Sequence, residues 1–172
     1  QSPDTPADLP HAEFQRVLAI DFEGTYSCCA VFGSAMARAG RGAIVNIASV
    51  AGMRSMPLHA YSPAKAAVIS LGECLAAEWG RSGVRVNTVS PGYTVTAALQ
   101  SQIDLGLRDP EKLKAHSALG RLIAPRDIGR VVVFLLSEEA GVLTGINVPA
   151  DAGWLVAGSW QTFGGVRAPQ PR

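Results

Sequence analysis

Two residues of the sequence, Tyr61 and Lys65, have side chains that can carry out acid/base chemistry together. They lie four positions apart in a segment predicted to be helical, so they share one helix face, one turn apart. A nearby ammonium favours the ionised form of a phenol and makes it a better proton acceptor near neutral pH. Ser49 leaves the end of a predicted strand, and a strand-to-helix turn can bring its hydroxyl beside the phenol. That edge of an open α/β sheet is where ligands bind.

The elements that must position these side chains are predicted from hydrophobic spacing and from glycine and proline breaks. The first strand is apolar on both faces, which is typical of a central parallel strand with neighbours on both sides. A strand, a helix and a second strand in this order predict a right-handed parallel unit. The predicted helices are 11–39, with a kink near Gly24, about 57–81 and 124–136, and the predicted strands are 43–49, 84–89 and 145–150.

The remaining segments divide the chain. Residues 1–10 contain three prolines and are predicted to form a surface lead-in loop. Residues 96–116, interrupted at Asp109-Pro110, are predicted to form a cover over a site. Residues 154–172 form a C-terminal tail, whose Trp154, Trp160 and Phe163 we expect to anchor on their own domain or at an interface between subunits. The catalytic domain is therefore assigned to residues 11–153.

Composition excludes several classes of protein. The chain has 172 residues, 48% of them hydrophobic, with a formal net charge of +1, as expected for one globular domain. This charge disfavours a nucleic-acid partner, and no apolar stretch approaches the roughly 20 residues that span a bilayer. His59 and His116 lack partners at metal-ligand spacing, so no metal site is expected. The three cysteines suit packing within helices in a reducing compartment, and we expect a cytoplasmic protein.

Three motifs in order resemble the short-chain dehydrogenase/reductase family of the classical type. The resemblance covers roughly residues 11–153, nearly the whole chain, but matches only the second half of that family's fold. It implies an α/β fold, the C-terminal half of a doubly wound Rossmann-like parallel sheet with helices on both faces. The motifs are Asn46-Ile-Ala-Ser49-Val-Ala-Gly52, Tyr61-Ser-Pro-Ala-Lys65, and Arg85-Val-Asn87-Thr-Val-Ser-Pro91-Gly92 with Thr96.

The resemblance also implies a role for each matching residue. Tyr61 is the catalytic acid/base, and Ser49 hydrogen-bonds the substrate's carbonyl or hydroxyl oxygen. Lys65 favours the ionised phenol and holds the ribose hydroxyls of the nicotinamide cofactor, which is NAD or NADP, with NAD slightly preferred. The family further implies a homodimer or a tetramer. The segment that touches the nicotinamide corresponds to Pro91, Gly92, Thr94 and Thr96.

Two departures from the family pattern affect the prediction. Where the family usually has asparagine in a helix motif, this chain has Asp21-Phe-Glu-Gly24, so the fourth catalytic candidate is Asp21 and the family's proton relay through Lys65 is in question. The family's glycine-rich dinucleotide loop has no counterpart, because Gly40-Arg-Gly42 precedes a strand instead of following one. The first strand would then keep an open edge, which natural folds avoid. We hypothesise that catalysis requires the missing half.

The leading interpretation is an oxidoreductase that interconverts a secondary alcohol and a ketone by hydride transfer. Its small-molecule substrate is a polyol or a 3-oxoacyl compound, with polyols favoured. A second interpretation is a non-catalytic or truncated half-domain that pairs with a complete subunit; Asp21 and the missing glycine-rich loop favour it. A third, epimerase or dehydratase chemistry with bound NAD, uses the same tyrosine and lysine.

Overall fold

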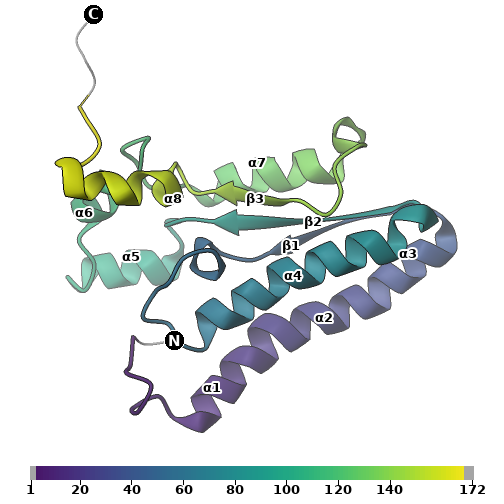
Figure 1. Ribbon diagram of the computed structural model, residues 1–172, viewed down its shortest axis with the longest axis horizontal. Coiled ribbons are helices and arrows are strands. Elements are labelled where there is room, and N and C mark those ends of the chain that lie inside the picture. The colour runs from purple at the N-terminus through teal and green to yellow at the C-terminus, as the bar shows by residue number, and fades with distance from the viewer. Residues whose placement is uncertain (1–2, 169–172) are drawn as a thin grey trace, which may run out of the picture.

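The computed structural model describes residues 3–168 and has an α/β architecture around one parallel sheet (Figure 1). Residues 1–2 of the predicted lead-in and residues 169–172 of the predicted tail lie outside this range. Gly42 lies opposite Val84 in the sheet, and Thr88 lies opposite Asn147. The strand order is β1-β2-β3, with β1 at Gly42–Ile47, β2 at Val84–Pro91 and β3 at Asn147–Ala150. The predicted fold class is confirmed.

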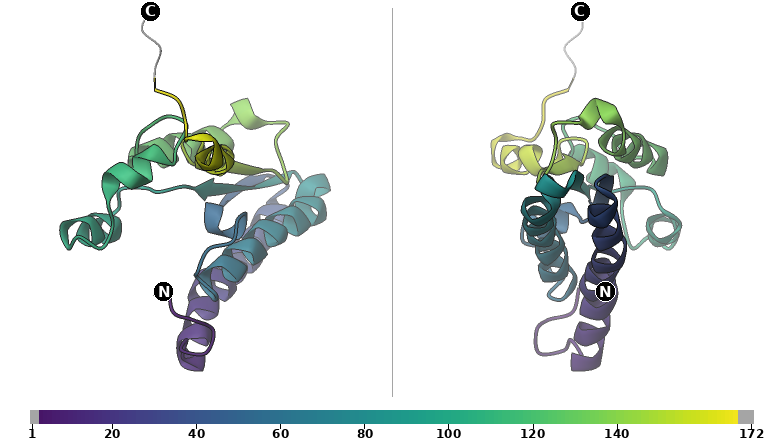
Figure 2. Two further views of the ribbon diagram at one scale, coloured as in Figure 1. Left: turned by 60° about the vertical axis from the view of Figure 1, so that its left-hand side comes forward. Right: turned by 90° about the vertical axis from the view of Figure 1, so that its right-hand side faces the viewer.

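Helices cover both faces of the sheet, as a doubly wound arrangement requires. Helix α4 (Tyr61–Trp79) and the long N-terminal helix lie side by side on one face, and α7 (Pro125–Leu136) lies on the other (Figures 1 and 2). On the α4 face, Ala76 packs against two valines of β2, with Met36, Ile44 and Trp79 around them. On the α7 face, Leu135 packs against Val89 of the same strand. Because both faces of β2 are covered, this strand is the most deeply buried.

The N-terminal helix runs without a break from His11 to Ala39, but its backbone is not uniformly α-helical. A kink was predicted near Gly24; the structure has two π-helical turns there, one on each side of α2. Gly40, at φ 73°, ends the helix in the left-handed conformation that glycine adopts readily. The segments are α1 at His11–Leu18, a π turn at Ala19–Glu23, α2 at Gly24–Cys28, a π turn at Cys29–Gly33 and α3 at Ser34–Ala39.

Three predicted boundaries next to the site shift in the structure. Strand β2 ends at Pro91 instead of residue 89. Helix α4 begins at Tyr61 instead of about residue 57, with Pro63 in its first turn, where a missing backbone N–H costs nothing. Strand β1 ends at Ile47 instead of residue 49. Ser49 has left the strand because its side chain caps the short helical turn Val50–Gly52.

Short helices gather beyond the carboxyl ends of the strands (Figure 1). The predicted break in the cover is confirmed, since Asp109 caps α6 by accepting the Glu111 N–H at 2.9 Å. The predicted tail starts with helical structure, and Trp154 anchors it by packing edge-on against Tyr93 with ring centroids 5.9 Å apart. Phe163 is 87% exposed. These elements are α5 at Ala97–Asp104, α6 at Pro110–Ala115, α8 at Trp154–Ala157 and a 3₁₀ turn at Gly158–Phe163.

The outer edge of β1 is unpaired within the described chain. Strand β1 pairs with β2 and with no second strand of residues 3–168, so the neighbour expected on its other side is not found there. Ile47 is accordingly 44% exposed at the end of this strand. Among the described helices, none combines the length and the apolar character needed to cross a bilayer.

Candidate active site

A cavity of about 440 Å³ lies at the carboxyl ends of β1 and β2. Parallel strands end at a common edge, which is where α/β sheets place their ligands. Seven predicted site residues line this cavity: Ser49, Tyr61, Lys65, Pro91, Gly92, Thr94 and Thr96. The others are Ile47, Ala48, Tyr93, Leu99, Pro125 and Ile128.

Ser49 lies at the start of the turn that follows β1 and caps it. Its backbone is extended, and its Oγ accepts the Ala51 N–H at 3.1 Å. A serine hydroxyl that accepts one hydrogen bond still has its own proton to donate. Gly52 ends the turn and lies directly against the backbone of α4, where a Cβ would come within 2.7 Å of Lys65 C and Ala66 N. The turn that carries Ser49 is thus seated on the helix that carries Tyr61 and Lys65.

Lys65 lies beneath the ring of Tyr61, as the four-residue spacing predicts. Its Nζ is 5.5 Å from the ring centroid, and it donates to the Ile47 carbonyl at 3.2 Å. The same Nζ forms an ion pair with Asp21 Oδ1 at 3.0 Å. With 11% of its side chain exposed, Lys65 holds its charge in a largely buried position beside the phenol. Hydrogen bonds and an opposite charge make that burial tolerable.

The segment after β2 forms the opposite wall of the cavity. Gly92 passes so close to the chain after β3 that a Cβ would lie 2.8 Å from Asp151 Cα. Thr94 Oγ1 donates to the Gly92 carbonyl at 3.1 Å, which folds this segment back on itself. Thr96 Oγ1 accepts the Leu99 N–H at 3.3 Å and so starts α5. The wall therefore offers threonine hydroxyls beside apolar surface.

Asp21 does not line the cavity. It reaches Lys65 from the N-terminal helix, and its side chain is 24% exposed. The structure thus brings all of the predicted catalytic candidates together, but gives Asp21 a different position from the other three.

Sequence reasoning missed some of the lining. Pro125 and Ile128 come from the first turn of α7, and Leu99 comes from α5. The apolar residues of a helix start carry no local sign that they face a ligand, because tertiary packing alone decides which site they approach. Tyr93 lies within the matched segment and could have been included from its position.

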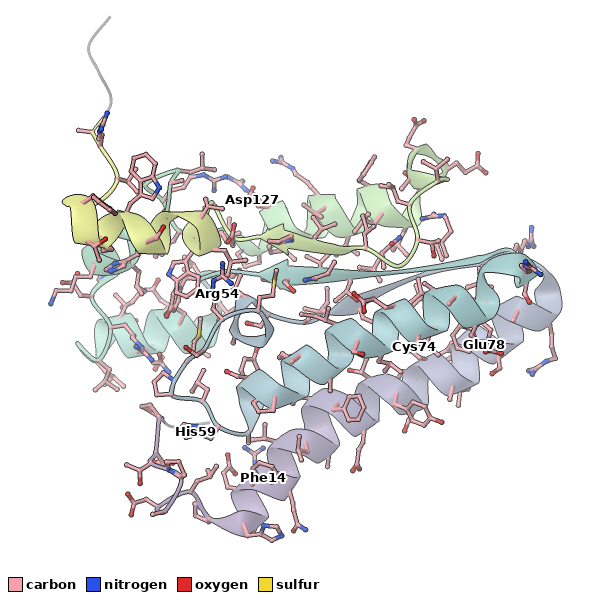
Figure 3. All side chains as sticks on the ribbon, viewed as in Figure 1. Phe14, Arg54, His59, Cys74, Glu78 and Asp127 are labelled. Atoms are coloured by element: carbon pink, nitrogen blue, oxygen red, sulfur yellow. The ribbon has the colours of Figure 1, made fainter. Side chains whose placement is uncertain are left out.

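The histidines and cysteines do not add a second chemical centre. His59 and His116 are exposed, and no group of three or more His, Cys, Asp or Glu within the described residues could hold a metal ion (Figure 3 shows His59 on the loop before α4). The prediction that all cysteines pack within helices is wrong for Cys28 and Cys74, which are exposed. Cys29 is buried, and burial raises the pKa of its thiol. All three are free thiols.

Comparison with known proteins decides the family. A sequence model described as enoyl-(acyl carrier protein) reductase matches residues 3–155. The chain belongs to the short-chain dehydrogenase/reductase family. A relative in this short-chain dehydrogenase/reductase family, galactitol 2-dehydrogenase of Rhizobium johnstonii, is 37% identical over 150 residues, which are 86% of this chain and 58% of that protein.

Two solved structures give the same fold for this dehydrogenase/reductase chain. A crystal structure described as ribose-5-phosphate isomerase from Brucella melitensis is 54% identical, with a TM-score of 0.95, and covers 98% of this chain and 65% of that one. A structure of ElxO with NADP bound is 29% identical, with a TM-score of 0.84, and covers 89% of this chain and 62% of that one. The short-chain dehydrogenase/reductase chain described here therefore spans less than two thirds of the length of these proteins.

Proposed function

We propose that this chain carries the catalytic half of an NAD(P)(H)-dependent oxidoreductase that interconverts a secondary alcohol and a ketone. The observation that carries the proposal is the meeting of Ser49, Tyr61 and Lys65 at one cavity on the carboxyl edge of the sheet. A bound nicotinamide cofactor would supply or accept the hydride. The Tyr61 hydroxyl gives a proton to the substrate oxygen or takes one from it. Ser49 hydrogen-bonds the same oxygen, and Lys65 stabilises the negative charge of the phenolate.

The residues around the cavity suit a nicotinamide nucleoside. Lys65 offers an ammonium to ribose hydroxyls, and Pro91 and Ile128 supply apolar lining that a planar ring can pack against. The hydroxyls of Thr94 and Thr96 line the same cavity and are hydrogen-bonding groups of the kind that a carboxamide uses. We propose NAD as the first cofactor to test and NADP as the second; the ElxO structure with NADP bound supports testing both.

For the substrate we propose a polyol or a related small hydroxy compound. The relative named galactitol 2-dehydrogenase supports this class. The family description as an acyl carrier protein reductase supports the other candidate, a 3-oxoacyl compound. Leu99 and Ile128 supply apolar surface that either class can use against its carbon chain.

An isomerase acting on a sugar phosphate is a weaker candidate, despite the description of one similar structure. A phosphate group needs cationic or backbone N–H partners. Among the described residues that line the cavity, Lys65 is the one cation, and Asp21 already pairs with it. The site thus has no cation to spare for a phosphate.

Completion of the sheet is part of the proposal. The open edge of β1 and the N-terminal helix enclose an apolar groove of about 590 Å³. Unpaired strand edges and exposed apolar grooves favour pairing with further structure. We propose that the domain assigned to residues 11–153 becomes active when additional strands cover this edge, within a cytoplasmic homodimer or tetramer. The groove is lined by Ile20, Gly24, Thr25, Cys28, Cys29, Phe32, Met36, Ala43, Ile44, Val45, Asn46 and Ile47.

The experiment is turnover of NADH and NADPH, and of NAD and NADP, with a panel of polyols, their ketones and 3-oxoacyl esters. We expect Tyr61→Phe to abolish turnover while cofactor binding persists. Tyr26→Phe, which removes the hydroxyl of an exposed tyrosine on α2, is the matched control and should keep full activity. Wild-type rates in Tyr61→Phe would refute the assigned role.

Two other results would favour the alternatives. If the chain pairs with a complete subunit but neither cofactor is bound or turned over at its own site even when additional strands cover the edge of β1, the non-catalytic half-domain is correct. If ribose 5-phosphate isomerises without any change in nicotinamide absorbance, the isomerase is correct.

A further inference from the structure

Asn147 is the first residue of β3, and both ends of its side-chain amide are hydrogen-bonded. Its Oδ1 accepts the Ser90 hydroxyl of β2 at 2.8 Å, and its Nδ2 donates to the Met53 sulfur at 3.2 Å. A thioether sulfur accepts hydrogen bonds but cannot donate them, so the nitrogen of the amide faces Met53 and its oxygen faces Ser90. The amide therefore has one defined orientation between its two partners.

These contacts lie on the face of the sheet that α4 covers. Asn147 lies opposite Thr88 in the parallel register, and Ser90 follows two residues later on β2, so all three side chains point to the same face. A Cβ at Gly72 of α4 would meet the Thr88 side chain, which identifies that face. None of the surface of Ser90 is exposed. The oxygen end of the Asn147 amide is thus bonded to a fully buried partner.

Met53 connects this amide to the turn that carries Ser49. It directly follows the turn Val50–Gly52, and its N–H donates to the first carbonyl of that turn at 3.0 Å. The Gly52 N–H donates to the Ser49 carbonyl at 2.9 Å, so residues 49–53 form one hydrogen-bonded unit, the Ser49 turn. Because β2 lies between β1 and β3, the Met53 side chain spans β2 to reach β3 (Figure 1).

The Ser49 turn is therefore held by two different elements. Gly52 lies against the backbone of α4, and Met53 bonds a side chain of β3. A contact with α4 alone leaves the turn free to tilt about that contact, whereas a second anchor on another element restricts the tilt. A hydroxyl bonds a substrate oxygen only at about 2.5–3.0 Å, so even a small tilt would take the Ser49 hydroxyl out of range.

We propose that Asn147 is a positioning residue, which holds the Ser49 turn in place through Met53. The inference rests on the proposed function for its catalytic consequence, because Ser49 hydrogen-bonds the substrate oxygen in that site. The restraint itself is a property of this chain, independent of cofactor or substrate. Met53 and Asn147 are 94 positions apart, so only the tertiary structure brings them together.

The first test observes the turn by NMR of the 172-residue chain. The Ala51 N–H bonds Ser49 Oγ at 3.1 Å, so its rate of exchange with D₂O reports whether the serine hydroxyl is in place. Asn147→Leu should speed this exchange about 2- to 10-fold, the range that corresponds to the loss of one hydrogen bond. It should also shift the methyl signal of Met53, one of three methionines in the chain. Backbone amide spectra check that each variant is folded.

Met53→Leu and Met36→Leu make the same change at two places. Leucine keeps roughly the volume of methionine but offers no acceptor. Met36 packs in the core beside Ala76 and does not line the catalytic cavity. We expect Met53→Leu to speed Ala51 exchange as much as Asn147→Leu does. Met36→Leu should leave that exchange unchanged. Met53→Gln, whose side-chain carbonyl can accept the Asn147 N–H, should restore slow exchange.

Two results overturn the proposal. One is unchanged Ala51 exchange in folded Asn147→Leu and Met53→Leu proteins. The other is equal acceleration in Met36→Leu, which would show a general loss of stability instead of a local release of the turn. If Asn147→Leu does not fold, Met53→Leu decides the question by itself.

A kinetic measurement separates this inference from the proposed function. If the chain reduces or oxidises a substrate, Asn147→Leu and Met53→Leu should lower kcat about fivefold or more with a nearly unchanged substrate KM, because a misplaced group at the reacting centre affects the reacting geometry first. Met36→Leu should keep the wild-type kcat, and Met53→Gln should recover most of it. An unchanged kcat in both Asn147→Leu and Met53→Leu would refute the positioning role and leave the proposed function standing. If no substrate turns over, the exchange measurement still decides whether Asn147 holds the turn.

Discussion

Replacing Gly52 with alanine should disconnect the serine of the site from its tyrosine and lysine. The Cβ of an alanine at this position would lie 2.7 Å from both Lys65 C and Ala66 N and 3.0 Å from Lys65 O. Ordinary contacts of a Cβ begin at 3.4 Å, so the turn and the helix must separate by about 0.7 Å. The neighbouring atoms are backbone atoms of α4, which cannot rotate away as a side chain can.

The magnitude follows from this displacement. Overpacking of a well-packed contact costs about 1–3 kcal/mol, which should appear as a lower free energy of unfolding. Ser49 lies three residues from Gly52 on the same turn and must move with it. A misplacement approaching 1 Å of a group at the reacting centre lowers the rate by about 10- to 100-fold. Gly52→Ala should therefore lose most of its kcat while remaining folded.

Gly33→Ala is the matched control for this measurement. A Cβ at Gly33 would collide with the ring of Trp79, a side chain away from the cavity lining. This variant should lose stability to a similar extent in urea unfolding, with a change in tryptophan fluorescence, yet keep its kcat. If Gly52→Ala and Gly33→Ala lower kcat equally, the contact between the turn and α4 does not position Ser49, and the reasoning fails.

Three further predictions concern stability. Arg85→Ala should lower the free energy of unfolding by about 2–3 kcal/mol in urea titrations, because the guanidinium donates to the carbonyls of Leu135 at 2.7 Å and Ser137 at 2.9 Å at the end of α7; an unchanged midpoint would show that these bonds contribute nothing. Ala152→Gly should raise the thermal midpoint slightly, since alanine at φ 54° carries a strain of about 1 kcal/mol that exceeds the entropy added to the unfolded chain. The third depends on pH. A hydrogen bond from Arg121 lowers the pKa of Asp127, so this carboxylate stabilises the fold above the ordinary pKa of an aspartate, and that contribution is lost as the pH falls through the folded-state pKa. Asp127→Asn should be less stable than wild type at neutral pH and equally stable in strong acid; a difference independent of pH would contradict this linkage.

The short-range features of this protein were predictable from its sequence, because neighbouring residues determine them. The spacing of Tyr61 and Lys65 places both on one helix face wherever the helix lies. The Asp109-Pro110 pair breaks the cover, since the aspartate caps a helix that the proline begins. Pro125 similarly begins α7. These outcomes need no information about the rest of the chain.

Some predicted element boundaries were wrong because the local sequence pattern was compatible with two different structures. The apolar pattern of residues 43–49 predicted a strand through Ser49. The Ser49 hydroxyl instead accepts a backbone N–H and caps a helical turn, so the strand ends two residues earlier, at Ile47. The sequence predicted a kink near Gly24, whereas the π turns on either side of α2 follow from no local pattern in the sequence.

The site itself depended on tertiary structure. Lys65 and Asp21 are distant in sequence, and only the packing of the N-terminal helix beside α4 brings carboxylate and ammonium to 3.0 Å. A separate contact, between the turn after β1 and α4, seats Gly52 on that helix, and α7 on the other face of the sheet brings Ile128 to the cavity. Sequence motifs thus determined which groups can perform the chemistry. The fold decided their separations, because contacts between distant segments are selected by the burial of a whole core and not by any one segment.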